Sequence, residues 1–134
     1  MPALTQSRIR RATALFKKAC YGGLVPGCLQ DDRESAGLFK KGCLGGVAAS
    51  CVALGIRYDR GLGVDKDLSQ GLVFYRKGCD GGEPTGCFLL GLRYELGFGV
   101  SKDGHKALAL YQEACAGGHQ TACEKRDALR TRPD

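Results

Sequence analysis

The sequence predicts an all-α protein, a solenoid of α/α hairpins, and a tandem repeat is the main reason. The eight cysteines come in pairs whose members lie 8 residues apart, and Cys43, Cys79 and Cys115 follow one another at steps of 36. Residues 43–78 aligned with 79–114 give 15 identities in 36 positions. Each copy holds two stretches with helical spacing of apolar residues, separated by glycine-rich turns. Because a lone helical hairpin cannot bury its apolar face, neighbouring copies must stack.

The first helix of each copy is expected to start near the second cysteine of a pair and to end at a Gly-x-Gly turn. One helical face carries residues at the i, i+3, i+4 and i+7 positions in both copies, namely Cys51, Leu54, Gly55 and Tyr58, then Cys87, Leu90, Gly91 and Tyr94. The turns at 61–63 and 97–99 offer glycines for a positive φ. Gly55 and Gly91 on the packing face predict a close helix–helix approach.

The second helix of each copy is expected to start after an aspartate N-cap, Asp67 or Asp103. Gln70 stands three residues after Asp67, as in a capping box. Apolar residues then recur at steps of three and four, namely Leu68, Leu72, Tyr75 and Cys79, with Leu108, Tyr111 and Cys115 in the next copy. This helix is expected to stop at Asp80-Gly81-Gly82.

The two ends of the chain depart from the repeat. Cys28 and Cys43 are 15 residues apart, where the full copies have 28, so a first helix and its turn are missing. Helices of the second type are still expected over Thr5–Cys20 and Asp31–Gly42. At the other end, the charged run Glu124-Lys125-Arg126 replaces Phe88-Leu89-Leu90, which is typical of a terminal helix with one face in water.

We therefore predict a single domain over residues 1–134. Residues 5–42 form irregular, shortened N-terminal repeats. Residues 43–78 and 79–114 are the full repeats, and residues 115–134 form a C-terminal capping helix. The 134-residue length is too short for two independent cores.

The paired cysteines predict structural disulfides across the repeat junctions. Within each pair, one cysteine closes a second-type helix and the other opens the next first-type helix, so the antiparallel junction can bring them within disulfide reach. The repeat favours one pairing over the 105 possible for eight cysteines: Cys20–Cys28, Cys43–Cys51, Cys79–Cys87 and Cys115–Cys123. Free thiols are the main alternative. A metal site is disfavoured because every gap holds seven residues rather than the two to four of zinc knuckles.

Charge and hydropathy narrow the function classes. The net charge is +6, from 20 Lys and Arg against 14 Asp and Glu, which suits an acidic partner. No basic and aromatic interleaving is present, so we expect no nucleic-acid binding. No run reaches the ~20 apolar residues of a membrane span. Disulfides favour a secreted or periplasmic location, although the opening residues lack the apolar core of a secretory leader.

The segments LGIRYDRGLGVDKDLSQGLVFYRKGCDGG and LGLRYELGFGVSKDGHKALALYQEACAGG carry a recognisable pattern, with Cys-x₇-Cys across each junction. In these features the chain resembles the Sel1-like repeat family, specifically its cysteine-rich Hcp-type branch. The resemblance covers residues 43–131 well and 5–42 partly. It implies a right-handed superhelix akin to tetratricopeptide repeats, used mostly as a protein-binding scaffold without a cofactor.

The same resemblance supplies two alternative functions. Hcp-type members have been classed as penicillin-binding proteins or β-lactamases. Another branch looks like assembly factors of the mitochondrial intermembrane space, a compartment that would suit disulfides without a secretory leader; a cytoplasmic location is also open.

Catalytic motifs argue against an enzyme. A serine β-lactamase needs S-x-x-K and K-T-G, and neither occurs in the sequence. His105 and His119 stand alone, one in the first turn of a helix and one in a junction loop, and are expected to be solvated rather than metal ligands. We expect no catalytic residue and no metal site.

The partner is expected to be a protein or peptide that binds a monomer on its concave face, which the resemblance assigns to the first-type helices. Five residues on these helices are the candidates: Arg57, Arg60, Phe88, Arg93 and Leu96. Arg57 and Arg93 recur in register, and either a peptide carboxylate or an internal hydrogen bond would explain them. The basic pairs Lys17-Lys18, Lys40-Lys41 and Arg76-Lys77 either form a cationic stripe or stabilise helix C-termini, and we favour the second explanation.

Overall fold

The computed structural model describes residues 27–131, with side chains from residue 32 onward. This part of the chain is helical throughout, apart from turns, which confirms the predicted all-α class. Its helices are α2 (Gly27–Leu44), α3 (Ala48–Arg60), α4 (Leu68–Asp80), α5 (Pro84–Leu96), α6 (Gly104–Ala116) and α7 (Gln120–Arg130).

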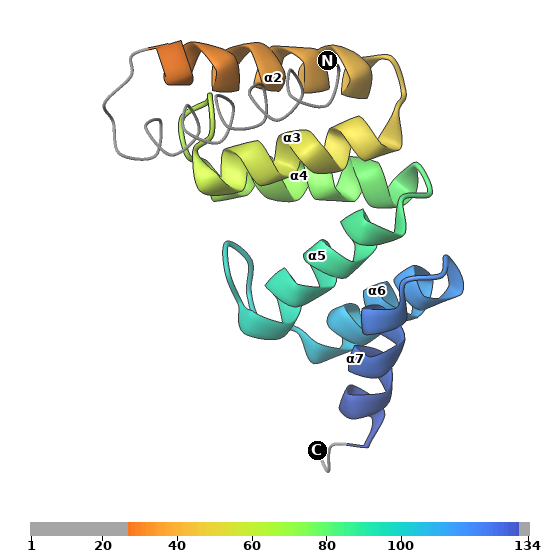
Figure 1. Cartoon of the computed structure of the whole chain (residues 1–134). Coiled ribbons are helices and arrows are strands. Elements are labelled where there is room, and N and C mark those ends of the chain that lie inside the picture. The colour runs from red at the N-terminus through yellow and green to blue at the C-terminus, as the bar shows by residue number, and fades with distance from the viewer. Residues whose placement is uncertain (1–26, 132–134) are drawn as a thin grey trace, which may run out of the picture.

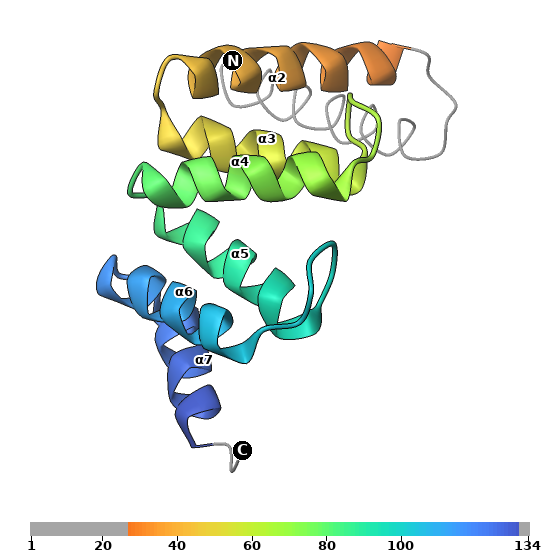
Figure 2. The same cartoon turned by 180° about the vertical axis from the view of Figure 1, so that it is seen from behind.

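The helices stack in chain order from α2 to α7 (Figure 1). α3 and α4 form one antiparallel hairpin and α5 and α6 form the next, while α2 packs on α3 and α7 packs on α6. The second hairpin is turned relative to the first, as both views show (Figures 1 and 2). The predicted helical-hairpin solenoid is thus confirmed.

Capping residues predicted from the sequence mark the helix boundaries. The Gln70 backbone N–H donates to Asp67 Oδ1 at 3.2 Å, and the backbone N–H groups of His105 and Lys106 donate to Asp103 Oδ1 at 3.1 Å. At the other end, α3 and α5 stop at Gly61 (φ +70°) and Gly97 (φ +75°), both in the left-handed region that favours glycine.

The two helices of a hairpin approach closely at a glycine. A Cβ atom on Gly55 would lie 2.7 Å from ring carbons of Tyr75, and one on Gly91 would lie 2.7 Å from the Tyr111 ring. Both tyrosines are almost fully buried, with 1% and 0% of their surface exposed. The close approach predicted from these glycines is therefore confirmed.

Disulfides cross three junctions and lie in or beside the core. Cys43–Cys51, Cys79–Cys87 and Cys115–Cys123 have Cα–Cα distances of 4.5, 4.5 and 4.7 Å, within the usual range. One core cluster combines the first pair with Leu54, and another combines the second pair with Ala114 and Ala122. The predicted pairings are confirmed at these junctions. The predicted Cys20–Cys28 bond lies outside the described side chains.

The predicted start of α2 is wrong by four residues, because the helix begins at Gly27 rather than Asp31. No residue between Gly27 and Asp31 breaks a helix, whereas Pro26 directly before Gly27 does. Carboxylates are favoured near a helix N-terminus, and for this reason the sequence predicts a start at Asp31, but Asp31 and Asp32 lie inside the helix. The predicted Thr5–Cys20 helix falls outside the described residues.

Candidate functional site

The five candidate binding residues lie on the first-type helices of successive repeats. Arg57 and Arg60 are on α3, and Phe88, Arg93 and Leu96 are on α5. These two helices contact each other directly.

Arg57 and Arg93 form ion pairs within the chain. Arg57 Nη1 lies 3.2 Å from Asp32 Oδ1 on α2, and the guanidinium also lies over the Phe39 ring, 5.5 Å from its centroid. Arg93 bonds to Asp59 on α3 in the same way, one repeat later. Each guanidinium thus joins its helix to an earlier helix in the chain. This agrees with the explanation that Arg57 and Arg93 recur because they form internal hydrogen bonds. A role toward a ligand carboxylate stays a prediction.

Asp59 also belongs to a hydrogen-bond network that the sequence analysis missed, and Glu95 occupies the equivalent place one repeat later. The Tyr75 hydroxyl donates to Asp59 Oδ2 at 3.2 Å, so Asp59 accepts from both Tyr75 and Arg93. One repeat on, the Tyr111 hydroxyl donates to Glu95 Oε1 at 3.3 Å, and Lys125 Nζ lies 3.8 Å from Glu95 Oε2. The sequence contained one signal for this network. Asp59 and Glu95 lie 36 positions apart, as do Tyr75 and Tyr111.

Burial raises the pKa of both tyrosines in this network. Burial, and next the Asp59 charge, raise the pKa of Tyr75 to about 12. Burial, reinforced by Glu95, also raises the pKa of Tyr111. Both hydroxyls are protonated near neutral pH, as any tyrosine is, and the raised pKa keeps them as donors to the carboxylates at more alkaline pH.

The other three candidates differ in exposure. Arg60 and Leu96 occupy equivalent positions at the ends of α3 and α5, and both are exposed, Leu96 by 56%. Phe88 is half-buried. Its ring packs against Tyr111 at a centroid distance of 5.9 Å and stacks on His119 at 4.4 Å. Phe88 therefore contributes to the junction core, and its role in binding a partner stays a prediction.

His119 is not the solvated loop residue that we expected. It is the N-cap of α7, and its Nδ1 accepts from the Ala122 backbone N–H at 3.1 Å while the ring stacks on Phe88. Histidine is an uncommon N-cap residue, so a cap at this position is not predicted from the residue type. His105 is exposed in the first turn of α6, as expected.

One cluster has the residue types of a metal site. The Sγ atoms of Cys79 and Cys87 and a Glu113 carboxylate oxygen lie within 4.8 Å of one another. The two sulfurs are joined to each other, however, so neither can offer the thiolate that a metal needs. The cluster as it stands is a disulfide with a neighbouring carboxylate.

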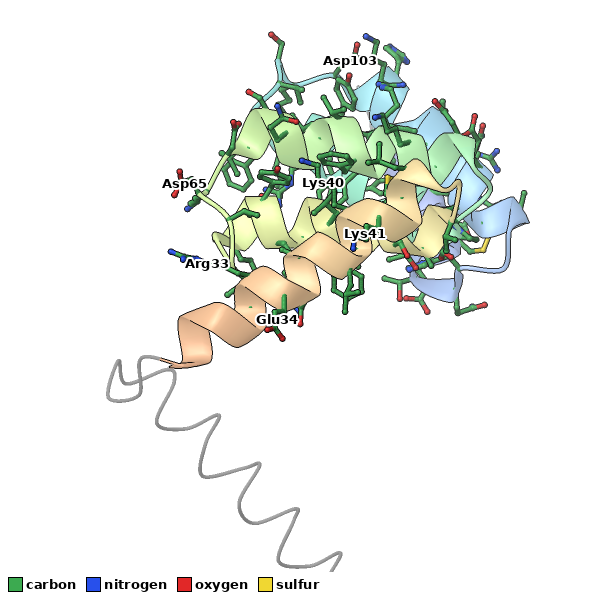
Figure 3. The ribbon with its side chains drawn as sticks, turned by 90° about the horizontal axis from the view of Figure 1, so that it is seen from above. Arg33, Glu34, Lys40, Lys41, Asp65 and Asp103 are labelled. Atoms are coloured by element: carbon green, nitrogen blue, oxygen red, sulfur yellow. A yellow bond between two sulfur atoms is a disulfide. The ribbon has the colours of Figure 1, made fainter. Side chains whose placement is uncertain are left out.

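The described basic pairs lie at the surface, in or near the last turns of their helices. Lys40 and Lys41 are exposed near the end of α2, at the opposite end from Arg33 and Glu34 (Figure 3). Arg76 and Lys77 are exposed at the equivalent place on α4. Lys17-Lys18 lies outside the described residues.

Beside the second of these pairs, α4 and α5 enclose an open pocket of about 290 Å³ that the sequence analysis did not predict. It is lined by residues of α4, of α5 and of the loop that follows, namely Leu72, Val73, Arg76, Lys77, Asp80, Leu90, Tyr94 and Val100.

Comparison with known proteins gives the family of this fold. The Sel1 repeat model matches residues 6–24, 12–47, 48–83 and 84–119. The chain belongs to the Sel1 repeat family. The last two matched units have the 36-residue length of the repeats recognised in the sequence and begin five residues later. A search of curated proteins finds no match.

Solved structures similar to this Sel1 repeat protein include a cysteine-rich protein. Helicobacter pylori cysteine rich protein B has 28% identity and a TM-score of 0.68, over 88% of this chain and 94% of that one. A Sel1 repeat protein from Oxalobacter formigenes has 27% identity and a TM-score of 0.72, over 83% of this chain. The protective antigen c5321 of uropathogenic Escherichia coli has 25% identity and a TM-score of 0.70, over 77% of this chain.

These relatives differ in size. The Sel1 repeat chain described here spans 44% of the Oxalobacter protein and 22% of c5321, but nearly all of the Helicobacter protein. The Hcp-type resemblance is thereby confirmed. Within residues 27–131, no helix has the length and apolar character needed to cross a bilayer.

Proposed function

We propose that this Sel1 repeat protein is a non-catalytic scaffold that binds a protein or peptide on the face formed by the first-type helices α3 and α5. One observation carries the proposal. Arg60 and Leu96 occupy the same register position, both are exposed, and the two copies differ there, whereas the buried Leu54 and Leu90 are identical. Residues that hold the fold are repeated, so variable exposed positions are where partner choice resides.

We propose further that the partner is acidic and that the protein works in an oxidising compartment. A net charge of +6 attracts acidic segments. Three disulfides and the likeness to a cysteine-rich Helicobacter protein support a secreted or periplasmic location. We propose that the protein acts there as a monomer.

Site-specific photo-crosslinking tests the binding face. A photoreactive phenylalanine analogue is placed at position 60 or 96, and at Ala109, which is exposed on the second-type helix α6, as the control. The proposal predicts a discrete crosslinked partner from positions 60 and 96 in the native secreted or periplasmic fraction, and loss of that product in the Arg60→Glu, Leu96→Asp double variant. Equal crosslinking from position 109 would contradict it.

A chromogenic cephalosporin assay tests the absence of catalysis. Because the sequence holds neither S-x-x-K nor K-T-G, the purified, oxidised protein is expected to hydrolyse the substrate at the background rate. Turnover above that rate would contradict the non-catalytic assignment.

A further inference from the structure

We propose a second binding site: the pocket between α4 and α5 takes an apolar side chain of an acidic peptide segment. Its lining includes neither Arg60 nor Leu96, and the proposal stands whether or not the face that carries these two residues binds a partner.

The pocket has an apolar floor and a fixed wall. Leu72 and Val73 of α4, Leu90 of α5 and Val100 of the following loop supply the apolar surface. That loop rests on α4, since a Cβ atom on Gly99 would lie 3.1 Å from Leu72 Cδ1. Val73 remains 47% exposed. At about 290 Å³, the pocket lies at the lower end of ligand sites, which suits one or two side chains.

Positive charge gathers around this apolar floor. Arg76 and Lys77 line the pocket, and the Arg76 guanidinium donates to the Tyr94 hydroxyl at 3.3 Å. Lys106 Nζ lies over the Tyr94 ring, 5.3 Å from its centroid. Among the described side chains, the salt bridges involve none of these three cations. Asp80 is the one carboxylate of the lining, so the pocket has an excess of positive charge.

The previous repeat provides a comparison within the same molecule. Lys40 and Lys41 of α2 correspond to Arg76 and Lys77, but Ala36 and Gly37 stand where α4 has Leu72 and Val73. Tyr58, which corresponds to Tyr94, stacks in parallel on the Phe74 ring, with 5.5 Å between the ring centroids. Among the described residues the basic pair occurs twice, and its second copy lines the pocket together with Leu72 and Val73.

Charge complementarity identifies the occupant. Exposed cations beside an apolar recess favour a ligand with carboxylates on either side of one apolar side chain, because the recess removes the apolar group from water while the carboxylates meet Arg76, Lys77 and Lys106. An acidic peptide with a leucine between aspartates and glutamates has this chemistry.

Fluorescence anisotropy with the full, oxidised chain tests the proposal. The probe is a labelled acidic peptide with one central leucine. Two further peptides replace the leucine by serine, or the acidic residues by their amides. The protein variants are Arg76→Glu with Lys77→Glu, the neutral change Val73→Gln to fill the apolar recess, and Lys40→Glu with Lys41→Glu as the control with the same change of charge. Circular dichroism confirms that each variant is folded.

The proposal predicts that the leucine peptide binds and that either change to the peptide weakens binding. The Arg76→Glu, Lys77→Glu variant and the Val73→Gln variant should each lose about tenfold in affinity, while the Lys40→Glu, Lys41→Glu variant keeps it. Equal losses in both double variants would show unspecific attraction and overturn the proposal. So would no binding at all, or self-association of the chain that Val73→Gln abolishes, since a second copy would then be the occupant.

Discussion

Single glycines set how closely the helices of a hairpin approach. Gly55 faces the Tyr75 ring, and the Gly71 carbonyl oxygen would lie 3.0 Å from an added Cβ atom. Because the backbone cannot give way as a flexible side chain can, the space is closed to a methyl group. The intrinsic helix penalty of glycine, up to about 1 kcal/mol, is offset by this packing.

Gly55→Ala should therefore destabilise the protein, although alanine is the better helix former. We expect a loss of about 1–3 kcal/mol in the free energy of unfolding, from overpacking against Tyr75 and Gly71. Urea denaturation measures it. Gly37→Ala is the matched control: Gly37 lies within α2 with no atom within 4 Å of an added Cβ, so this change should stabilise by about 0.5–1 kcal/mol. A stabilising Gly55→Ala would contradict the close approach.

Because the buried tyrosines have a raised pKa, the free energy of unfolding is expected to fall at alkaline pH. The pKa of Tyr75 is about 12 in the folded protein against 10.0 when unperturbed. The proton is thus held more tightly in the folded chain, and the resulting stabilisation is present in full below pH 10 and is lost as pH rises from 10 through 12.

Tyr75→Phe should reduce this alkaline loss. Between about pH 9 and pH 11, the parent should lose about 1.4 kcal/mol more than the variant, since each pKa unit corresponds to that amount. The variant should also be less stable at neutral pH, because it lacks the hydroxyl that donates to Asp59. Urea midpoints across this pH range measure the effect. Parallel pH profiles for parent and variant would contradict it.

The junctions between helices are closed by disulfides that differ in burial. Cys43–Cys51 and Cys79–Cys87 are buried, with every cysteine at most 8% exposed, while Cys115 and Cys123 are half-buried next to the terminal helix α7. Closing a loop of nine residues contributes about 2.5 kcal/mol in the loop-entropy estimate, so each bond matters to a fold with small cores.

Graded reduction should open Cys115–Cys123 first. Attack by a thiolate requires access to a sulfur, and Cys115 and Cys123 are more exposed than the cysteines of the two buried bonds. Alkylation at increasing reductant concentration, followed by peptide mass mapping, gives the order. Earlier opening of Cys79–Cys87, in the middle of the stack, would contradict the burial described here.

Local chemistry explains why most elements could be predicted. Asp67, Asp103 and the Gly-x-Gly turns act within one or two turns of the chain, so their effect is visible in the sequence. The start of α2 was missed because two aspartates imitated a helix start. His119 was missed because histidine is an uncommon cap and because its stacking partner Phe88 comes from a different helix.

The candidate site was predicted less well, because it depends on how repeats stack. The recurrence of Arg57 and Arg93 was visible, but their partners Asp32 and Asp59 lie 25 and 34 residues away at unequal spacings. The α4–α5 pocket likewise combines residues of two repeats and a loop. Neither arrangement follows from the period of the sequence alone.

Ion pairs join successive first-type helices, α3 to α5 and α5 to α7, in addition to the disulfides. Asp59 and Arg93 join α3 to α5, and Asp59 also accepts from Tyr75 of α4, so one carboxylate contacts two other helices. Glu95 repeats the arrangement with Tyr111 of α6 and Lys125 of α7.

A double-mutant cycle on Asp59→Asn and Arg93→Gln should give a coupling of about 1 kcal/mol, because both side chains are at most 20% exposed. The Arg126–Asp127 pair, on one helix with Asp127 64% exposed, is the control, and its coupling should stay below about 0.5 kcal/mol. Urea denaturation of the single and double variants provides both values. Equal coupling in the two cycles would contradict a structural role for the inter-repeat pair.

Non-reducing peptide mass mapping of protein purified without reductant tests most directly the claim that covalent bonds fasten neighbouring hairpins. We predict linked peptides for Cys43–Cys51, Cys79–Cys87 and Cys115–Cys123, with Cys20–Cys28 as the fourth pair expected from the sequence. Free thiols at these positions, or bonds that join different pairs, would contradict the account.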